Sequence, residues 1–121
     1  MVKATSAALV GLLALASLAS GAGAATKTVS VDDNFFKPKR LTVTVGDKVT
    51  WKWDGFVAHN VVVETGPQKF KSKTKSDGKF SRVITKPGIY RIVCTLHPGM
   101  TMRLTATPPV EPTTTSTPPP S

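Results

Sequence analysis

Between Thr26 and Ala106, hydrophobic and polar residues alternate with a period of two residues, rather than the 3.6 of an amphipathic helix. Turn-forming pairs such as Gly46-Asp47 and Pro87-Gly88 separate the alternating runs. The pattern predicts seven short strands, at residues 29–31, 41–45, 48–53, 61–63, 79–84, 89–93 and 103–106. Such a series of strands and turns favours an all-β fold, an antiparallel sandwich or barrel.

The first 25 residues do not follow this pattern. Lys3 supplies a positive charge, an apolar run extends from Ala7 to Leu18, and small residues lead to Ala22-Gly23-Ala24. This order is typical of a secretory signal peptide, whose cleavage site follows a small-x-small triplet. The apolar run has about 12 residues, fewer than the about 20 that span a bilayer. We therefore expect residues 1–25 to be removed, and the mature chain, without a transmembrane helix, to be periplasmic, extracellular or at the cell surface.

Residues 107–121 differ again, because they contain six proline, five threonine and two serine residues. Such a composition cannot bury an apolar face, so we expect a disordered tail. A linker, a wall-spanning stalk and a target for O-glycosylation are alternatives with the same composition. The compact part is therefore residues 26–106, a single small domain.

The chain of 121 residues has a formal net charge of +9, two histidines and a single cysteine. One cysteine excludes an intramolecular disulfide, and two histidines exclude an enzyme with several histidine-bound metals. Five lysines lie between Lys69 and Lys79. This basic segment is either a solvated edge or a patch that attracts an acidic redox partner or an anionic surface. Nucleic-acid binding is not expected of an exported protein without base-stacking aromatic residues beside its charges.

The single cysteine lies in a loop rich in metal-binding side chains. Cys94 directly follows the strand predicted at 89–93, and His97, Met100 and Met102 come soon after it. Cysteine and methionine sulfur atoms favour Cu(I), and an imidazole also accepts Cu(II). On its own, a cysteine is more often buried and inert, and a histidine such as His59 is more often a surface residue. Together, two His, one Cys and a distant Met make up the trigonal site with a weak axial ligand found in electron-transfer copper proteins.

Four stretches of the compact part match a known family. They are Phe36-Lys37-Pro38, Leu41 to Trp53, Ala58-His59-Asn60-Val61-Val62, and Pro87-Gly88-Ile89-Tyr90 continuing to Cys94 and His97. In these stretches the chain resembles the small blue copper proteins of the plastocyanin, amicyanin and halocyanin group, the cupredoxins. The resemblance covers residues 26–106 and implies a Greek-key β-sandwich that binds one type 1 copper ion.

The resemblance also implies which residues form the copper site. It makes His59, Cys94 and His97 copper ligands, and it makes Asn60 the residue whose hydrogen bonds tie the two ligand loops together. For the axial ligand, amicyanin-like spacing indicates Met100 and plastocyanin-like spacing indicates Met102. We favour Met100, because the last strand then begins where it does in the amicyanin-like arrangement.

From these observations we expect a monomeric one-electron carrier that cycles between Cu(I) and Cu(II) and exchanges electrons with redox protein partners. Only an electron has to reach such a site, so it needs no open coordination position, and we do not expect an enzyme. By the resemblance, His97 is the imidazole through which electrons enter. One alternative is a copper storage or delivery protein, in which Met100 and Met102 help to hold Cu(I). Another is a metal-free adhesion module, which leaves the spacing of the Cys94 loop unexplained.

Overall fold

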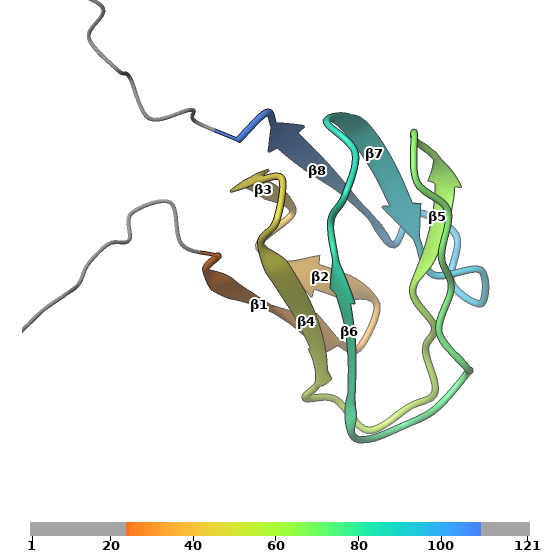
Figure 1. Cartoon of the computed structure of the whole chain (residues 1–121). Coiled ribbons are helices and arrows are strands. Elements are labelled where there is room, and N and C mark those ends of the chain that lie inside the picture. Colours follow the sequence, from red (N-terminus) through yellow and green to blue (C-terminus); the bar gives the residue numbers. More distant parts are fainter. Residues whose placement is uncertain (1–23, 110–121) are drawn as a thin grey trace, which may run out of the picture.

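The structure, a computed structural model, describes residues 24–109, and within them it contains eight strands and no helix. The strands are β1 (Thr26–Asp32), β2 (Phe35–Lys37), β3 (Arg40–Thr44), β4 (Lys48–Trp53), β5 (Val62–Thr65), β6 (Lys79–Val83), β7 (Gly88–Val93) and β8 (Thr101–Thr107). They form two four-stranded sheets, in the orders β2-β1-β4-β6 and β3-β8-β7-β5 (Figure 1). The expected all-β sandwich is confirmed.

The sheets are mixed, whereas the sequence pattern favoured antiparallel ones. β1 pairs with β4 in parallel, and β3 pairs with β8 in parallel; the other neighbours are antiparallel. The turn at Gly46, with a φ of 104°, joins β3 to β4, but these two strands belong to different sheets. Because the chain passes from one sheet to the other at this turn, β3 and β4 do not become partners although they are consecutive in sequence.

Alternation along the strands does predict which side chains face the core. On β8 the buried residues are Met102, Leu104 and Ala106, each separated by a more exposed neighbour. Trp51 on β4 is fully buried, and its ring packs against Phe70 and Phe80 at centroid distances of 5.6 and 5.8 Å. The two sheets therefore enclose one apolar core, as expected of a sandwich whose inner faces alternate with solvated outer faces.

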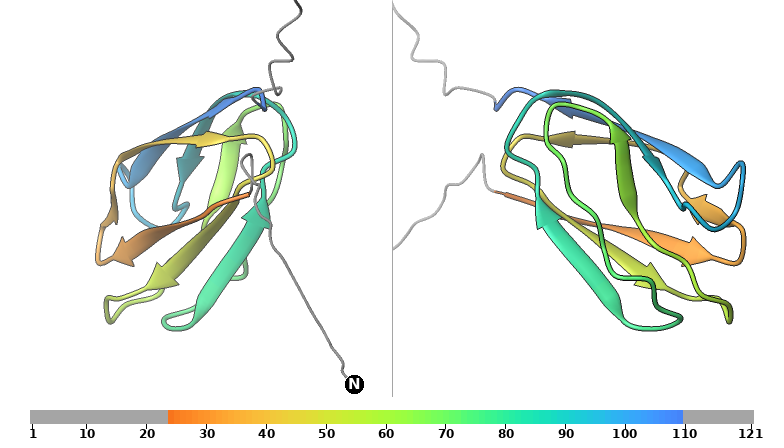
Figure 2. Two further views of the ribbon diagram at one scale, coloured as in Figure 1. Left: turned by 60° about the vertical axis from the view of Figure 1, so that its left-hand side comes forward. Right: turned by 90° about the vertical axis from the view of Figure 1, so that its right-hand side faces the viewer.

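The loops that follow β4 and β7 lie at one end of the sandwich, together with the turn between β1 and β2. In the right-hand view of Figure 2 this is the right-hand end, while β1 begins and β8 ends at the opposite end. The targeting segment and the proline-rich tail predicted from the sequence lie mostly outside the described residues. Within residues 24–109, no helix is long and apolar enough to cross a membrane.

Candidate metal centre

Cys94 is the first residue after β7, and hydrogen bonds close the loop that it begins. The Cys94 N–H donates to the carbonyl of Met100 at 3.0 Å, and the Met100 N–H donates to the carbonyl of His97 at 3.1 Å. Gly99 has a φ of 86°, in the left-handed region that favours glycine, and it makes the tight return of the chain possible. The loop therefore holds the sulfur and the His97 imidazole on one short, closed segment.

His59 reaches the same place from the loop between β4 and β5. Its N–H donates to the carbonyl of Lys75 at 3.0 Å, and its own carbonyl accepts the Lys75 N–H and the indole N–H of Trp53, both at 3.1 Å. These three bonds fix the backbone on both sides of the side chain. The imidazole itself is fully buried.

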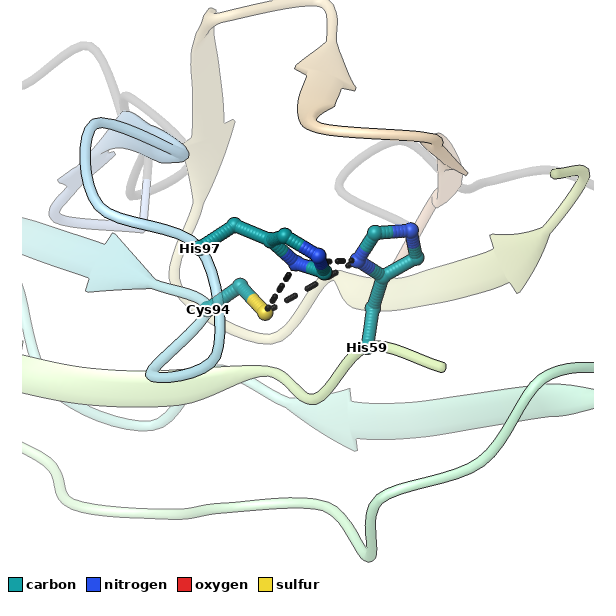
Figure 3. Close-up of side chains that lie close together, drawn as sticks. All are labelled: His59, Cys94 and His97. Atoms are coloured by element: carbon teal, nitrogen blue, oxygen red, sulfur yellow. Dashed lines mark hydrogen bonds between the residues drawn. The ribbon is translucent and has the colours of Figure 1, made fainter. Parts of the chain in front are cut away.

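The structure brings His59, Cys94 and His97 together with one nitrogen or sulfur atom of each facing a common point (Figure 3). The His59 Nδ1 lies 3.1 Å from the His97 Nδ1 and 3.8 Å from the Cys94 Sγ, which lies 3.7 Å from the His97 Nδ1. A triangle with these edges has a centre about 2.1 Å from each corner, the length of a bond from a first-row metal to nitrogen or sulfur. Two imidazoles and one thiolate around such a point fit copper.

Of the three side chains that face this point, only one is more than marginally exposed to solvent. His59 and Cys94 are buried, and His97 is partly exposed. Water is therefore kept away from most of the ligand set, and a bound ion would be approached most easily at the His97 ring.

Both candidate axial methionines are buried, but different parts of the fold hold them. Met100 is the residue whose backbone closes the Cys94 loop. Met102 lies on β8, opposite Ile92 of β7, and belongs to the regular ladder of that hairpin. Of the two, Met100 is therefore fixed directly to the backbone of Cys94 and His97.

Asn60 joins the two loops through a reciprocal pair of hydrogen bonds. Its side-chain NH₂ donates to the Thr95 Oγ1 at 2.9 Å, and its side-chain carbonyl accepts the Thr95 N–H at 2.8 Å. Asn60 directly follows His59, and Thr95 directly follows Cys94. The two bonds therefore hold His59, in one loop, at a fixed position relative to Cys94, in the other loop.

Asp33, in the turn between β1 and β2, is a residue that the sequence analysis did not single out. Its Oδ1 lies 3.1 Å from the Nε2 of His59, the ring nitrogen opposite the one that faces Cys94. The carboxylate also accepts the N–H groups of Phe56 and Val57. The bonds from Val57 and Phe56, and then the one to His59, hold the pKa of Asp33 below its usual value. A carboxylate in this position keeps the proton of His59 on Nε2, so that the lone pair of Nδ1 is free for a metal.

The basic segment runs beside the His59 loop. Residues 70–75 form hydrogen bonds to residues 59–63, including the bridges between Lys75 and His59 and between Lys71 and Val62. The Lys75 Nζ lies 5.0 Å from the centre of the Trp53 ring, where the π face attracts a cation. Lys71 and Lys73 are exposed. One part of the segment thus supports the candidate metal centre and another part faces solvent.

Comparison with known proteins relates this geometry to a family. Residues 24–107 match the copper binding proteins of the plastocyanin/azurin family. Amicyanin-alpha of Methylorubrum extorquens is 31% identical to the chain over 105 residues, which cover 78% of this chain and 88% of the relative.

Two solved structures are similar in fold. A purple cupredoxin from Nitrosopumilus maritimus superposes with a TM-score of 0.62 at 24% identity, over 67% of this chain and 99% of its own. A copper-containing nitrite reductase from Thermus scotoductus superposes with a TM-score of 0.62 at 30% identity, over 85% of this chain. That match covers only 25% of the reductase, so the similarity concerns one part of a much larger protein.

Proposed function

The chain belongs to the plastocyanin/azurin family of copper-binding proteins, and on that premise we propose that it is an exported one-electron carrier. Copper is its cofactor. We assign its three strong ligands to His59, Cys94 and His97 and its weak axial ligand to Met100. Copper bound there supplies the one-electron chemistry, and the chain supplies the fixed positions of the ligands.

The burial of the ligand set is the observation that supports a carrier most strongly. His59 and Cys94 are enclosed, the hydrogen bonds of Asn60 tie their loops together, and those of Met100 close the Cys94 loop. A site built this way changes little when an electron arrives or leaves, and it has no open position for a substrate. A protein that delivers copper would need a more open site, because the ion itself must be released.

The proposed path for electrons runs through His97. It is the partly exposed imidazole of the set, and exposed apolar side chains lie in the two ligand loops, namely Phe56, Val57 and Leu96. Apolar contact around a partly exposed ligand allows a partner to come close without displacing it. The exposed Lys71 and Lys73 add positive charge next to the His59 loop, which favours an acidic redox partner.

The single copper site also supports a carrier over an enzyme. The assignment uses both histidines and the cysteine of the chain, so none is left for a second copper.

Repeated redox cycling tests the proposal against copper delivery. The copper-loaded protein is reduced and reoxidised many times in the presence of a Cu(I) chelator, and both the colour and the chelated copper are followed. A carrier returns to its full colour in each cycle and loses no copper to the chelator. Transfer of the copper to the chelator at the first reduction would instead establish a storage or delivery protein.

A further inference from the structure

The Asp47 carboxylate lies at the end of the sandwich opposite the metal centre, and it is nearly inaccessible to solvent, with 5% of the residue exposed. One of its oxygens closes the turn between β3 and β4. The Oδ2 accepts the Thr44 N–H at 2.9 Å, and the Asp47 N–H donates to the carbonyl of Thr44 at 2.9 Å. The turn does not account for the other oxygen, Oδ1, which accepts a bond from the backbone nitrogen of Ala25 at 2.9 Å.

Ala25 is held in place from its other side as well. Its carbonyl accepts the Lys48 N–H at 2.9 Å, and the parallel pairing of β1 with β4 begins one residue later, at Thr26. The nitrogen of Ala25 is therefore fixed against Asp47 by the start of the sheet. In the sequence, the triplet Ala22-Gly23-Ala24 ends immediately before this nitrogen.

We propose that the peptide bond between Ala24 and Ala25 is the processing site of the chain, and that the α-ammonium group freed by the cut forms an ion pair with Asp47. The peptidase of the export route adds one water molecule across this amide bond. Ala24 departs with the new carboxylate, and the nitrogen of Ala25 becomes an ammonium group. The sequence analysis places the end of the targeting segment at residue 25, so this cut falls one residue earlier.

The local charges favour this product. The unprocessed chain offers Asp47 a neutral amide donor at Ala25, whereas the processed chain offers a cation at the same place. A charge-assisted hydrogen bond is about twice as strong as a neutral one. Among residues 24–109, the only other charge that acts on the carboxylate from a packed strand is that of Lys27 on β1. The side chain of Lys48, the residue after Asp47, is exposed. Processing thus gives a buried carboxylate the opposite charge that a buried ion needs.

The pH dependence follows from the pairing. The ammonium group gains a partner on folding, so its pKa in the folded chain is raised above the about 7.7–8.0 of a free α-amino group. Its contribution to stability is fully present below that range and disappears as the pH rises through the folded-state pKa. An unprocessed chain has an amide at this position, which does not titrate, so its stability should not fall in this way at alkaline pH.

The inference rests on the export part of the proposed function, but it does not depend on copper. The first test is to express the full chain in an exporting bacterium and determine the N-terminus of the exported product. We expect Ala25. An N-terminus at Thr26 or further along would overturn the proposal.

The second test uses four proteins with defined first residues. Two begin at Ala25 and two keep Gly23 and Ala24, and each pair has either Asp47 or Asp47→Asn. At pH 6 we expect Asp47→Asn to lower the equilibrium constant for folding in both pairs. The factor should be at least five times larger in the chains that begin at Ala25 than in those that keep Gly23 and Ala24. Equal losses in both pairs would overturn the proposal. It would also be overturned if the chain with both Ala25 as its first residue and Asp47 did not lose stability at alkaline pH, or if the other three chains lost it equally. Copper binding should be the same in all four, so a failed copper assignment would be seen separately.

Discussion

Asp33 and His59 are in contact through the imidazole nitrogen that faces away from Cys94, with 3.1 Å between the Oδ1 and the Nε2. The same carboxylate accepts backbone N–H groups from the loop that carries His59. Asp33 thus orients the ring and the loop together, from the turn between β1 and β2. The position of His59 therefore depends on contacts between three separate segments of the chain.

Replacing Asp33 with asparagine should weaken copper binding. The amide lacks the negative charge that holds the proton on Nε2, and the loss of such a partner typically lowers metal affinity about 10- to 100-fold. Competition with a copper chelator of known affinity measures the change. Asp54→Asn is the matched control, because Asp54 is exposed and contacts Ser30 and Lys52 instead of the site. Equal affinities for the two variants would contradict the role given to Asp33.

The two methionines should respond differently to substitution by leucine. Met100→Leu should keep a coloured site but raise its reduction potential, because the substitution removes the sulfur that we propose as the weak axial ligand. Met102→Leu should leave the potential unchanged and cost less than about 1.5 kcal/mol of stability, because it conserves volume within the β7–β8 core. Voltammetry of both variants decides between them. A raised potential in Met102→Leu alone would make Met102 the axial ligand.

Asn60→Ala should lower the unfolding free energy of the copper-free protein by about 1–2 kcal/mol, since two hydrogen bonds between the ligand loops are lost. Denaturant titration measures this change. Thr95→Ala is a graded comparison, because it removes only the hydroxyl acceptor and leaves the Thr95 N–H bonded to Asn60. It should cost less than Asn60→Ala, and the reverse order would show that the two loops are joined in another way.

The charges of Lys71 and Lys73 should speed up reaction with an acidic redox partner. Converting both to glutamate should slow the second-order rate about tenfold or more at low salt, and the difference should shrink as salt screens the charges. Lys75 is left unchanged, because it contacts Trp53 and the His59 backbone. Stopped-flow measurements with an acidic electron acceptor test this prediction. Identical rates at low salt would make the basic segment a solvated edge only.

The sequence predicts the strands well because one face of each strand is buried. On β8, for example, the apolar residues Met102, Leu104 and Ala106 alternate with more polar ones and indicate the buried face directly. Alternation does not report which strand is the neighbour or in which direction it runs, so the parallel pairs β1–β4 and β3–β8 could not be predicted. β2 was missed because three residues are too few for a pattern.

The metal centre could be predicted only in part, for a similar reason. Cys94 and His97 share one loop, so their spacing is visible in the sequence, and the resemblance to cupredoxins adds His59. Asp33 lies 26 residues before His59 and touches it only after the sandwich has formed. No local pattern marks such a contact. The choice between Met100 and Met102 also needs the fold, because both are apolar, buried and two residues apart.

The central claim is that His59, Cys94 and His97 together hold one type 1 copper ion. The most direct measurement is to add Cu(II) in steps to the copper-free protein and to its Cys94→Ser variant, and to record the visible spectrum during reduction and reoxidation. The account predicts an intense blue band that saturates at one copper per chain, bleaches on reduction and returns on reoxidation. The variant should lack this band, because the thiolate is its source. An equally intense band in Cys94→Ser, or no band in the unsubstituted protein, would contradict the account.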